Sequence, residues 1–171
     1  ILQKHTPKAI FIMLGINDFL HQPPFHVPSR IDSFLSRRIP AATPFCKGSV
    51  NIGNTLYWSV KTIPRTVHAY AALLNQIKTQ SPKTRIFVQS VLPTHKDIFY
   101  KYYHFQINSR IIQRLNHALK QLAEQEHVTF IDLSPSFIKN GSLDPAFTGD
   151  GVHLNASGNT AWREAIKDYV P

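Results

Sequence analysis

The sequence Ala-Ile-Phe-Ile-Met-Leu-Gly-Ile-Asn-Asp occupies residues 9–18 and joins a short apolar run to a polar turn. A nearly unbroken apolar run of this length predicts a strand of a parallel sheet, because such a strand is covered on both faces. Gly15, Asn17 and Asp18 follow the predicted strand 9–14 directly. Open α/β sheets bind their ligands at the carboxyl ends of the strands, so these polar residues are candidates for a functional site.

Two later apolar runs, residues 85–91 and 128–133, predict two more buried strands of the same kind. Apolar residues at helical spacing lie between the strands and after the last one, namely Val67, Tyr70, Leu74 and Ile77, then Ile107, Ile111, Leu115, Ala118, Leu119 and Leu122, then Trp162, Ala165, Ile166 and Tyr169. We interpret these residues as core and assign them no ligand. The alternation of strands and helices predicts a single α/β domain over residues 1–171.

Local signals mark the ends of two of these helices. Pro64 suits the first turn of the first helix, and Ser81-Pro82 would end it. Asn155 or Ser157 is the expected N-cap of the last helix, since either side chain can accept a hydrogen bond from a first-turn N–H.

Residues 21–59 interrupt this pattern with a segment that is rich in proline, basic and aromatic residues. It contains Pro23, Pro24, Pro28, Pro40, Pro44, Phe25, Phe34, Phe45, Tyr57 and Trp58. A loop this long inside a compact domain is usually functional or mobile. Two interpretations stay open: a lid or flap that contacts a substrate, and a passive insertion packed on the helices.

The chain carries a formal net charge of +9, and its charges are unevenly placed. No acidic residue lies between Asp32 and Asp97, an interval that contains Arg37, Arg38, Lys47, Lys61, Arg65, Lys78, Lys83 and Arg85. A basic surface attracts phosphates, anionic lipid head groups or acidic glycans. No nucleic-acid-binding motif accompanies it, so a plain basic surface is preferred to a nucleic-acid site.

Other residue patterns exclude several kinds of site. No apolar stretch approaches the roughly 20 residues that a membrane-spanning helix needs, so no transmembrane segment is expected. Cys46 is the single cysteine, which excludes an internal disulfide and a multi-cysteine metal site. The nine histidines, His21 and His26 among them, lack the spacing of metal ligands, so neither a metal nor a cofactor is expected.

A second polar cluster, Asp150-Gly151-Val152-His153, precedes the last predicted helix. A histidine that acts as a general base needs an acceptor on its other ring nitrogen, which holds the tautomer and stabilises the imidazolium. Asp150 and His153 can meet in this way across a tight turn, and Gly151 allows the backbone to bend. An ordinary Asp-Gly turn followed by a surface histidine is the alternative.

Taken together, the segments "IFIMLGIND", "IFVQSVLP", "VTFIDL" and "DGVHLNASGNTAW" resemble, in order and spacing, the SGNH hydrolases, a GDSL-type family of esterases, lysophospholipases and acetylhydrolases. The resemblance covers residues 9–169 apart from the Pro-rich insertion. It implies a three-layer, flavodoxin-like fold with a parallel sheet.

The resemblance also implies a role for four residues. Asp150 would be the acid that orients His153, and His153 would be the general base. Asn17 would donate a hydrogen bond to the oxyanion, and Gly15 would keep the mouth of the site open.

The family's Gly-Asp-Ser block, which supplies the serine nucleophile, does not occur in these residues. We expect that block and the first strands of the sheet to precede Ile1, so the chain by itself should be inactive. The strand at 9–14 should then be a bare apolar edge through which chains could associate. Ser90 resembles a different block of the family and is not expected to be the nucleophile.

The resulting hypothesis is a serine ester hydrolase that removes an acyl group, such as acetyl, from a sugar or lipid ester. The alternative is a non-catalytic SGNH-like module that binds a glycan, a lipid or another anionic partner. The sequence before Ile1 distinguishes the two, because an intact Gly-Asp-Ser block supports the enzyme and a replaced serine supports the binder. The cellular compartment stays open, and a periplasmic or secreted location is compatible with the resemblance.

Overall fold

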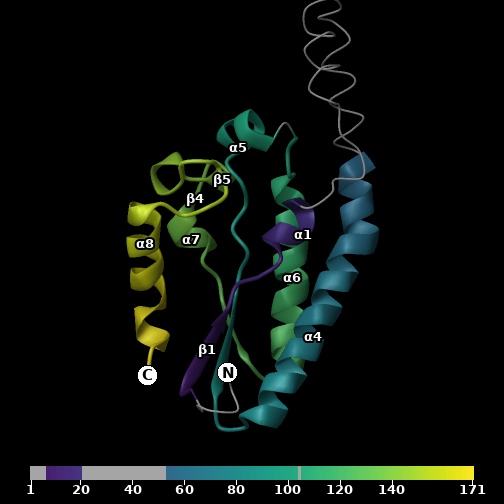
Figure 1. Cartoon of the computed structure of the whole chain (residues 1–171), viewed down its shortest axis with the longest axis vertical. Helices are drawn as coiled ribbons and strands as arrows, with labels where there is room; N and C mark the ends of the chain where they lie inside the picture. Colours follow the sequence, from purple (N-terminus) through teal and green to yellow (C-terminus); the bar gives the residue numbers. More distant parts are fainter. Residues whose placement is uncertain (1–6, 21–52, 104) are drawn as a thin grey trace, which may run out of the picture.

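The three predicted strands form one parallel sheet in the computed structural model of this chain (Figure 1). The structure describes residues 7–20, 53–103 and 105–171. The strands are β1 (Ala9–Ile12), β2 (Arg85–Gln89) and β3 (Thr129–Ile131), in the order β1-β2-β3. Both pairings are parallel, so all three strands end at the same side of the sheet. The predicted α/β class with a parallel sheet is confirmed.

Each strand is shorter than its apolar run. Beyond the ends of β1 and β2, side chains of the helices bind the backbone. The Tyr70 hydroxyl accepts a hydrogen bond from the Leu14 N–H at 2.7 Å and donates one to the Leu14 carbonyl at 3.0 Å. The Asn116 amide does the same for Val91, with 2.8 Å for both contacts. The backbone polar groups at these positions are therefore satisfied outside the sheet.

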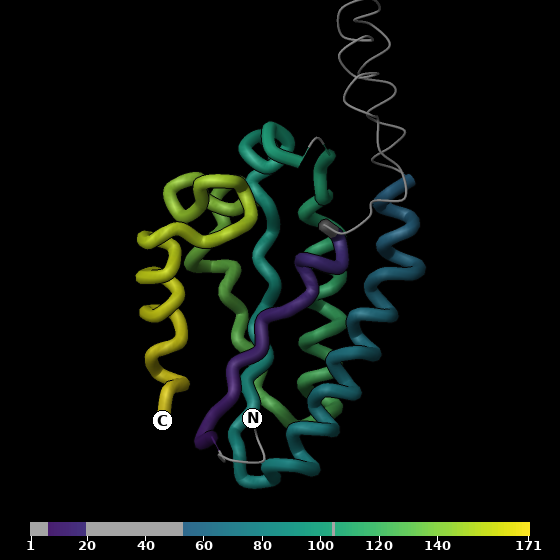
Figure 2. Tube along the Cα trace, viewed as in Figure 1, coloured from purple at the N-terminus to yellow at the C-terminus, as the bar shows by residue number. Residues whose placement is uncertain are grey.

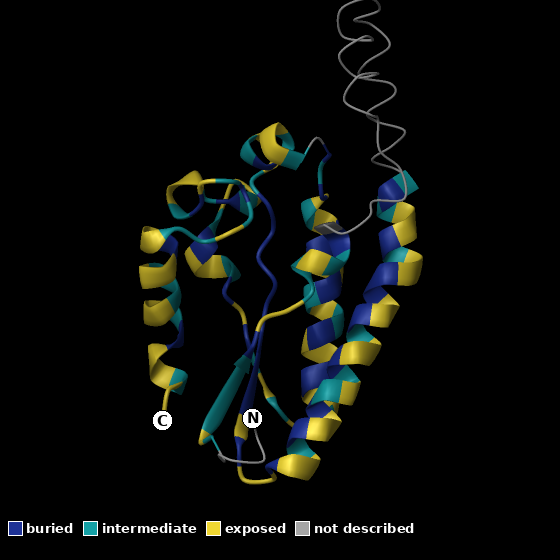
Figure 3. Ribbon diagram, in the orientation of Figure 1, coloured by how far each residue is buried: buried dark blue, intermediate teal, exposed yellow. Residues whose placement is uncertain are grey.

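Helices cover the sheet on both sides and complete three layers (Figures 1 and 2). On one side lie α4 (Ile63–Gln80) and α6 (Ser109–Gln125), which pack against each other. On the other side lies α8 (Ala156–Ile166), followed by the short helix η3 (Lys167–Tyr169). The apolar stripes predicted for all three helices face inward, as Figure 3 shows by their buried inner surfaces.

The strands supply one face to each of two apolar clusters. The Ile86 and Val88 side chains belong to the cluster under α4 and α6, whereas Phe87 belongs to the cluster under α8. Phe11 pairs in register with Phe87, and their rings stack with centroids 4.7 Å apart. This period of two is what a strand covered on both sides requires.

The helix ends follow the local signals in the sequence. Pro64 lies in the first turn of α4, and Ser81 is the C-cap of that helix, as predicted. Asn155 rather than Ser157 caps α8, and its side-chain oxygen accepts a hydrogen bond from the Gly158 N–H at 2.9 Å.

The last part of the segment 21–59 is helical, where a loop was expected. Residues 53–57 are helical, and they continue through η1 (Trp58–Thr62), a turn of π-helix, into α4. Trp58 is 1% exposed and lies against Phe19 and Phe105. Burial of so large a side chain is worth about 2–3 kcal/mol, which favours a packed helix over a loop at this position. The remainder of the insertion, including Cys46, His21 and His26, lies outside the described residues.

The segment between β2 and α8 contains elements that the sequence analysis did not predict. These are α5 (Lys96–Tyr103), α7 (Ser134–Phe137), β4 (Ile138–Lys139), β5 (Ser142–Leu143) and η2 (Pro145–Phe147). Strands β4 and β5 form a hairpin, and its turn residues Asn140 and Gly141 have φ values of 52° and 74°. Positive φ at both positions is typical of a type I′ turn, for which Asn-Gly is a strong sequence signal.

In the described part of the chain, β1 is an edge strand that has β2 on one side only. Its residues are less buried than those of β2, and Met13 and Leu14 beyond its end are 39% and 55% exposed. The bare edge expected at 9–14 is therefore present within the described sheet. Association through this edge stays a prediction. None of the described helices is both long enough and apolar enough to cross a membrane.

Candidate active site

Both predicted polar clusters lie at the carboxyl end of the sheet. The first occupies the turn after β1 and the short helix α1 (Ile16–Leu20), and the second occupies the loop that leads into α8. Figures 1 and 2 show α1, α5 and this loop at the end toward which the strands run. The placement agrees with the expectation that ligands bind at this edge of an open sheet.

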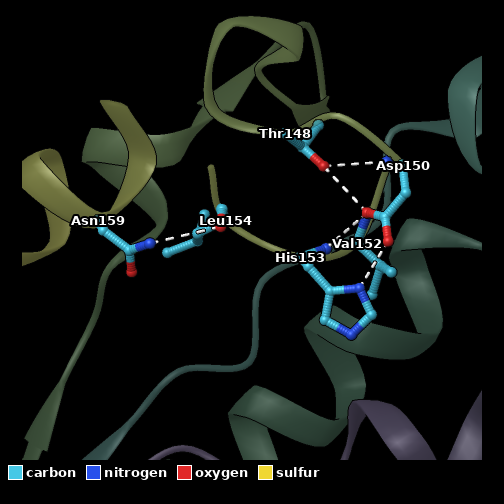
Figure 4. Close-up of polar contacts among 7 residues, drawn as sticks. Thr148, Asp150, Val152, His153, Leu154 and Asn159 are labelled. Atoms are coloured by element: carbon cyan, nitrogen blue, oxygen red, sulfur yellow. Dashed lines mark hydrogen bonds and ion pairs between the residues drawn. The ribbon is translucent and has the colours of Figure 1, made fainter. Parts of the chain in front are cut away.

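Asp150 and His153 contact each other as the sequence predicts (Figure 4). Oδ2 of Asp150 lies 2.6 Å from Nδ1 of His153, and Oδ1 accepts hydrogen bonds from the backbone N–H groups of Val152 and His153 at 3.0 and 2.9 Å. An ionised carboxylate can only accept, so Nδ1 carries a proton, and in the neutral imidazole Nε2 then has the free lone pair. The His153 side chain is 68% exposed, which leaves Nε2 accessible to a reactant.

Thr148 and the close packing of Gly151 against Phe99 hold the backbone of this loop. The Thr148 hydroxyl, in a residue that is 5% exposed, accepts a hydrogen bond from the Gly151 N–H at 2.9 Å and lies 3.4 Å from Oδ1 of Asp150. Gly151 has φ +89°, and a Cβ at this position would lie 2.5 Å from the backbone nitrogen of Phe99. Both the backbone conformation and the packing therefore require glycine, which confirms its predicted part in the turn. The Gly151 carbonyl also accepts from the His95 N–H at 2.8 Å.

The electrostatics of the site favour a charged Asp150. Partial burial raises the pKa of its carboxyl. Hydrogen bonds from the His153 side chain and from the backbone of His153 and Val152 outweigh burial and lower that pKa to about 2. Burial, followed by the charge of Asp150, raises the pKa of Tyr103 in α5. Asp150 is thus an ion that can stabilise an imidazolium at His153, and Tyr103 is a neutral neighbour.

The first cluster is anchored on α4. The Thr66 hydroxyl donates to Oδ2 of Asp18 at 2.5 Å, and the Asp18 N–H donates to the Gly15 carbonyl at 3.1 Å. Gly15 has φ +112°, and a Cβ there would lie 3.3 Å from Thr66 and 3.4 Å from Leu115. The backbone turn therefore favours glycine, and a Cβ would in addition make a tight contact with Thr66. The predicted effect of Gly15 on the mouth of the site stays a prediction.

Asn17 is exposed in the first turn of α1. It lines a pocket of about 420 Å³ that is formed by Met13, Leu14, Gly15, Ile16, Asn17, Asp18, Thr66, Ala69, Tyr70 and Leu73. Burial and, to a smaller extent, the charge of Asp18 raise the pKa of Tyr70 to about 12, although its hydrogen bond with Leu14 lowers that pKa. The hydroxyl therefore stays protonated and can hold the end of β1. Among the described residues, no hydrogen bond or ion pair joins Asn17 to Asp150 or His153.

Ser90 has a structural contact and not a reactive one. It is fully buried, and its Oγ accepts a hydrogen bond from the Leu133 N–H at 2.9 Å, which links the ends of β2 and β3. No described residues form a group of three or more His, Cys, Asp or Glu that could hold a metal ion.

Thr148 and Tyr103 also belong to the site, although neither was expected there from the sequence. The sequence pattern could have predicted Thr148, because a hydroxyl residue two positions before an Asp-Gly turn is a common partner for the backbone of that turn. No sequence pattern predicts Tyr103, since its approach to Asp150 depends on how α5 packs on the loop.

The sequence profile of the GDSL-like Lipase/Acylhydrolase family matches residues 1–161. No curated protein matches the chain.

Solved structures resemble the chain at low sequence identity. A protein assigned as a platelet activating factor from Streptococcus pneumoniae is 24% identical, with 68% of this chain and 55% of that one covered and a TM-score of 0.59. A protein assigned as an acylhydrolase from Bacteroides fragilis NCTC 9343 is 19% identical, with 95% and 61% covered and a TM-score of 0.63. The acetyl xylan esterase AlAXEase is 16% identical, with 100% and 70% covered and a TM-score of 0.54.

At these identities the structural likeness demonstrates a shared fold. The chain spans less than two thirds of the length of the first two structures.

Proposed function

Because the chain belongs to the GDSL-like Lipase/Acylhydrolase family, we propose that it carries the acid and the base of a serine ester hydrolase. The observation that supports the proposal most strongly is the 2.6 Å contact between Asp150 and His153, which leaves Nε2 of an exposed imidazole available for proton transfer. We propose further that residues 1–171 form a single domain and that the nucleophilic serine lies in sequence before Ile1.

In the proposed reaction, Nε2 of His153 accepts the proton of the serine hydroxyl as the serine attacks the ester carbonyl. Asp150 keeps its negative charge and stabilises the imidazolium that forms. The same imidazolium then gives its proton to the departing alcohol, and an acyl-enzyme remains. Water, deprotonated by His153, releases the carboxylic acid and restores the serine.

Asn17 is the proposed side-chain donor to the oxyanion of the tetrahedral intermediate, and Gly15 is proposed to leave the approach open. Asn17 is exposed at the carboxyl end of β1 and lines a pocket, which supports its proposed role. Loss of one such donor lowers turnover by about 10²–10³-fold.

The proposed substrate is a small acyl ester, such as an O-acetylated sugar or a lysophospholipid. AlAXEase, one of the structures that share the fold, is an acetyl xylan esterase. The basic interval between Asp32 and Asp97 supports a substrate or surface that carries negative charge.

Hydrolysis of a short-chain p-nitrophenyl ester by the protein that includes the upstream serine tests the proposal. His153→Ala should lower turnover by about 10⁶-fold, since removal of a triad base abolishes nucleophile activation. His117→Ala is the matched control, because His117 is exposed on α6. Equal rates for the wild type and His153→Ala would reject the catalytic pair.

The non-catalytic glycan-, lipid- or anion-binding module is the second candidate. A Gly-Asp-Ser block before Ile1 supports the enzyme, whereas a block whose serine is replaced supports the binder. A steep salt dependence of oligonucleotide affinity would instead support nucleic-acid binding.

A further inference from the structure

A second pocket of about 300 Å³ opens where the start of α5, the start of α6 and the β4–β5 hairpin meet. It is lined by Thr55, Thr94, Lys96, Gln106, Ile107, Asn108, Ser109, Asn140, Gly141 and Ser142, and we name it the polar pocket. None of Asp150, His153 and Asn17 lines it. Figure 1 shows these three segments together at the carboxyl end of the sheet.

The side chains that line the polar pocket are polar or positively charged, apart from Ile107. It holds hydroxyl groups, side-chain amides and the ammonium group of Lys96, and it includes no carboxylate. Amides and hydroxyls can donate to any oxygen-rich ligand. The ammonium group has only donors, and no carboxylate among the lining residues supplies a counter-charge.

Thr94 has a buried hydroxyl without a partner. The residue is 4% exposed, and its Oγ1 forms no hydrogen bond with the described residues. Burial of an unsatisfied hydroxyl is unfavourable. An acceptor atom that enters the pocket beside Thr94 would remove this penalty.

The start of α6 adds a positive end to the same pocket. This helix has 17 residues, and its N-cap Asn108 and first residue Ser109 both line the pocket. The amino end of a helix attracts anions because the helix dipole is positive there. Asn108 already accepts from the N–H groups of Arg110 and Ile111 at 3.0 and 2.9 Å, so the dipole is the main contribution of this helix end. The helix end and Lys96 therefore favour the same charge.

The polar pocket is connected to the loop of His153 by short hydrogen bonds. The Thr94 carbonyl accepts from the Ser142 hydroxyl at 2.9 Å. The next residue, His95, donates its N–H to the Gly151 carbonyl at 2.8 Å. The pocket and the Asp150–His153 pair are thus held in a fixed relation, as two parts of one substrate site would be.

We infer that the polar pocket binds a carboxylate or phosphate group on the substrate whose ester is cleaved at His153. The inference rests on the proposed function for its link to hydrolysis. The two oxyanions share the chemistry that the pocket recognises, with Lys96 and the α6 N-terminus facing the charge and Thr94 donating to one oxygen.

Binding to the chain is measured first, by following backbone amide NMR shifts during titration with glucuronate, inorganic phosphate and, as a neutral control, glucose. Glucuronate or phosphate should shift the amides of residues 94–96 and 108–109, while glucose should not. Lys96→Gln should raise the Kd for glucuronate and for phosphate by about tenfold, because it removes a charge-assisted contact. Lys101→Gln on the same helix lies outside the pocket and should leave the Kd unchanged.

Thr94→Val separates a ligand contact from a structural one. This variant keeps the side-chain shape and should raise the Kd for the anion by about threefold to tenfold. It should not lower the denaturation midpoint, because the lost hydroxyl has no partner among the described residues. Binding that is the same for glucose and glucuronate, or unchanged in both Lys96→Gln and Thr94→Val, would overturn the inference.

Kinetics of the protein that includes the upstream serine then test the link to hydrolysis. Lys96→Gln should raise KM about tenfold for an acetylated glucuronate, while KM for acetylated glucose stays unchanged. A pocket that binds anions without this difference would contradict its role in substrate binding. If neither ester is cleaved in a His153-dependent way, the proposed function fails, whereas the NMR titration still decides whether the pocket is an anion site.

Discussion

At the scale of single residues, the spacing of Asp150 and His153 lets one carboxylate make several bonds. Oδ1 accepts from two backbone N–H groups of the turn, and Oδ2 is left for the imidazole. The backbone bonds prevent rotation of the carboxylate away from His153. Thr148 and Gly151 hold the turn itself, one through a hydroxyl and the other through a backbone conformation that favours glycine.

The pKa of Asp150 gives a prediction at this scale. The carboxyl should titrate at about pH 2 rather than at its ordinary 3.8, because hydrogen bonds to the charged form outweigh burial. His153→Ala removes one donor and should raise that pKa. Carbon-13 NMR of the Asp150 carboxyl against pH measures both values, and an unchanged midpoint in His153→Ala would show that the imidazole is not its partner.

The same shift links to stability with a definite sign. A pKa that is lower in the folded state stabilises the protein above the unfolded-state value, and this contribution is lost as the pH falls toward about 2. The difference in the free energy of unfolding between wild type and Asp150→Asn should therefore shrink from pH 5 to pH 2. A difference that is constant over this range would contradict the assignment.

At the scale of elements, the short pieces between β2 and α8 position the site. The start of α5 contacts Gly151, and the β4–β5 hairpin reaches the polar pocket. Asn155, the N-cap of the last helix, lies two residues after His153 and also donates to the Ala146 carbonyl at 2.9 Å. The end of the loop that carries Asp150 and His153 and the start of α8 are therefore fixed together.

The cap of α8 can be tested with a matched pair of variants. Asn155→Ala should lower the free energy of unfolding by about 1 kcal/mol, because the N–H of Gly158 loses its acceptor. Ser157→Ala is the control, since Ser157 is exposed inside the first turn and is not the cap. Urea unfolding of both variants measures the difference, and equal losses would contradict the assignment of the cap to Asn155.

At the scale of the whole molecule, the described sheet is covered on both faces but open along β1. The Lys8 carbonyl accepts a hydrogen bond from the Arg85 N–H, and backbone groups alternate in direction along a strand. The N–H groups of Ala9 and Phe11 therefore point away from β2. An edge of this kind is a template for pairing with another chain.

Two proline variants test pairing along this edge. We predict that the chain self-associates through β1 and that Ala9→Pro suppresses association without unfolding, because it removes an N–H that points outward. Ile10→Pro is the contrast, since it removes an N–H directed at β2 and should destabilise the sheet. Sedimentation across a range of concentrations reports association, and a strong self-association that survives in Ala9→Pro would place the interface elsewhere.

Much of this architecture follows from local patterns in the sequence. Apolar runs predict the three strands, helical spacing predicts α4, α6 and α8, and the Asp150–His153 pair is visible because its members are three residues apart. These features depend on neighbours in the chain, so local chemistry is enough to predict them.

Other features depend on contacts between distant segments, and only the tertiary structure decides them. Trp58 is helical and buried because Phe19 and Phe105 surround it, although its neighbours in sequence predict a loop. Beyond the ends of β1 and β2, the backbone is bound by Tyr70 and Asn116, which belong to other elements. The polar pocket is formed by segments that are separated in the chain. Packing energies over such distances are set by the whole fold, and no short stretch of sequence carries them.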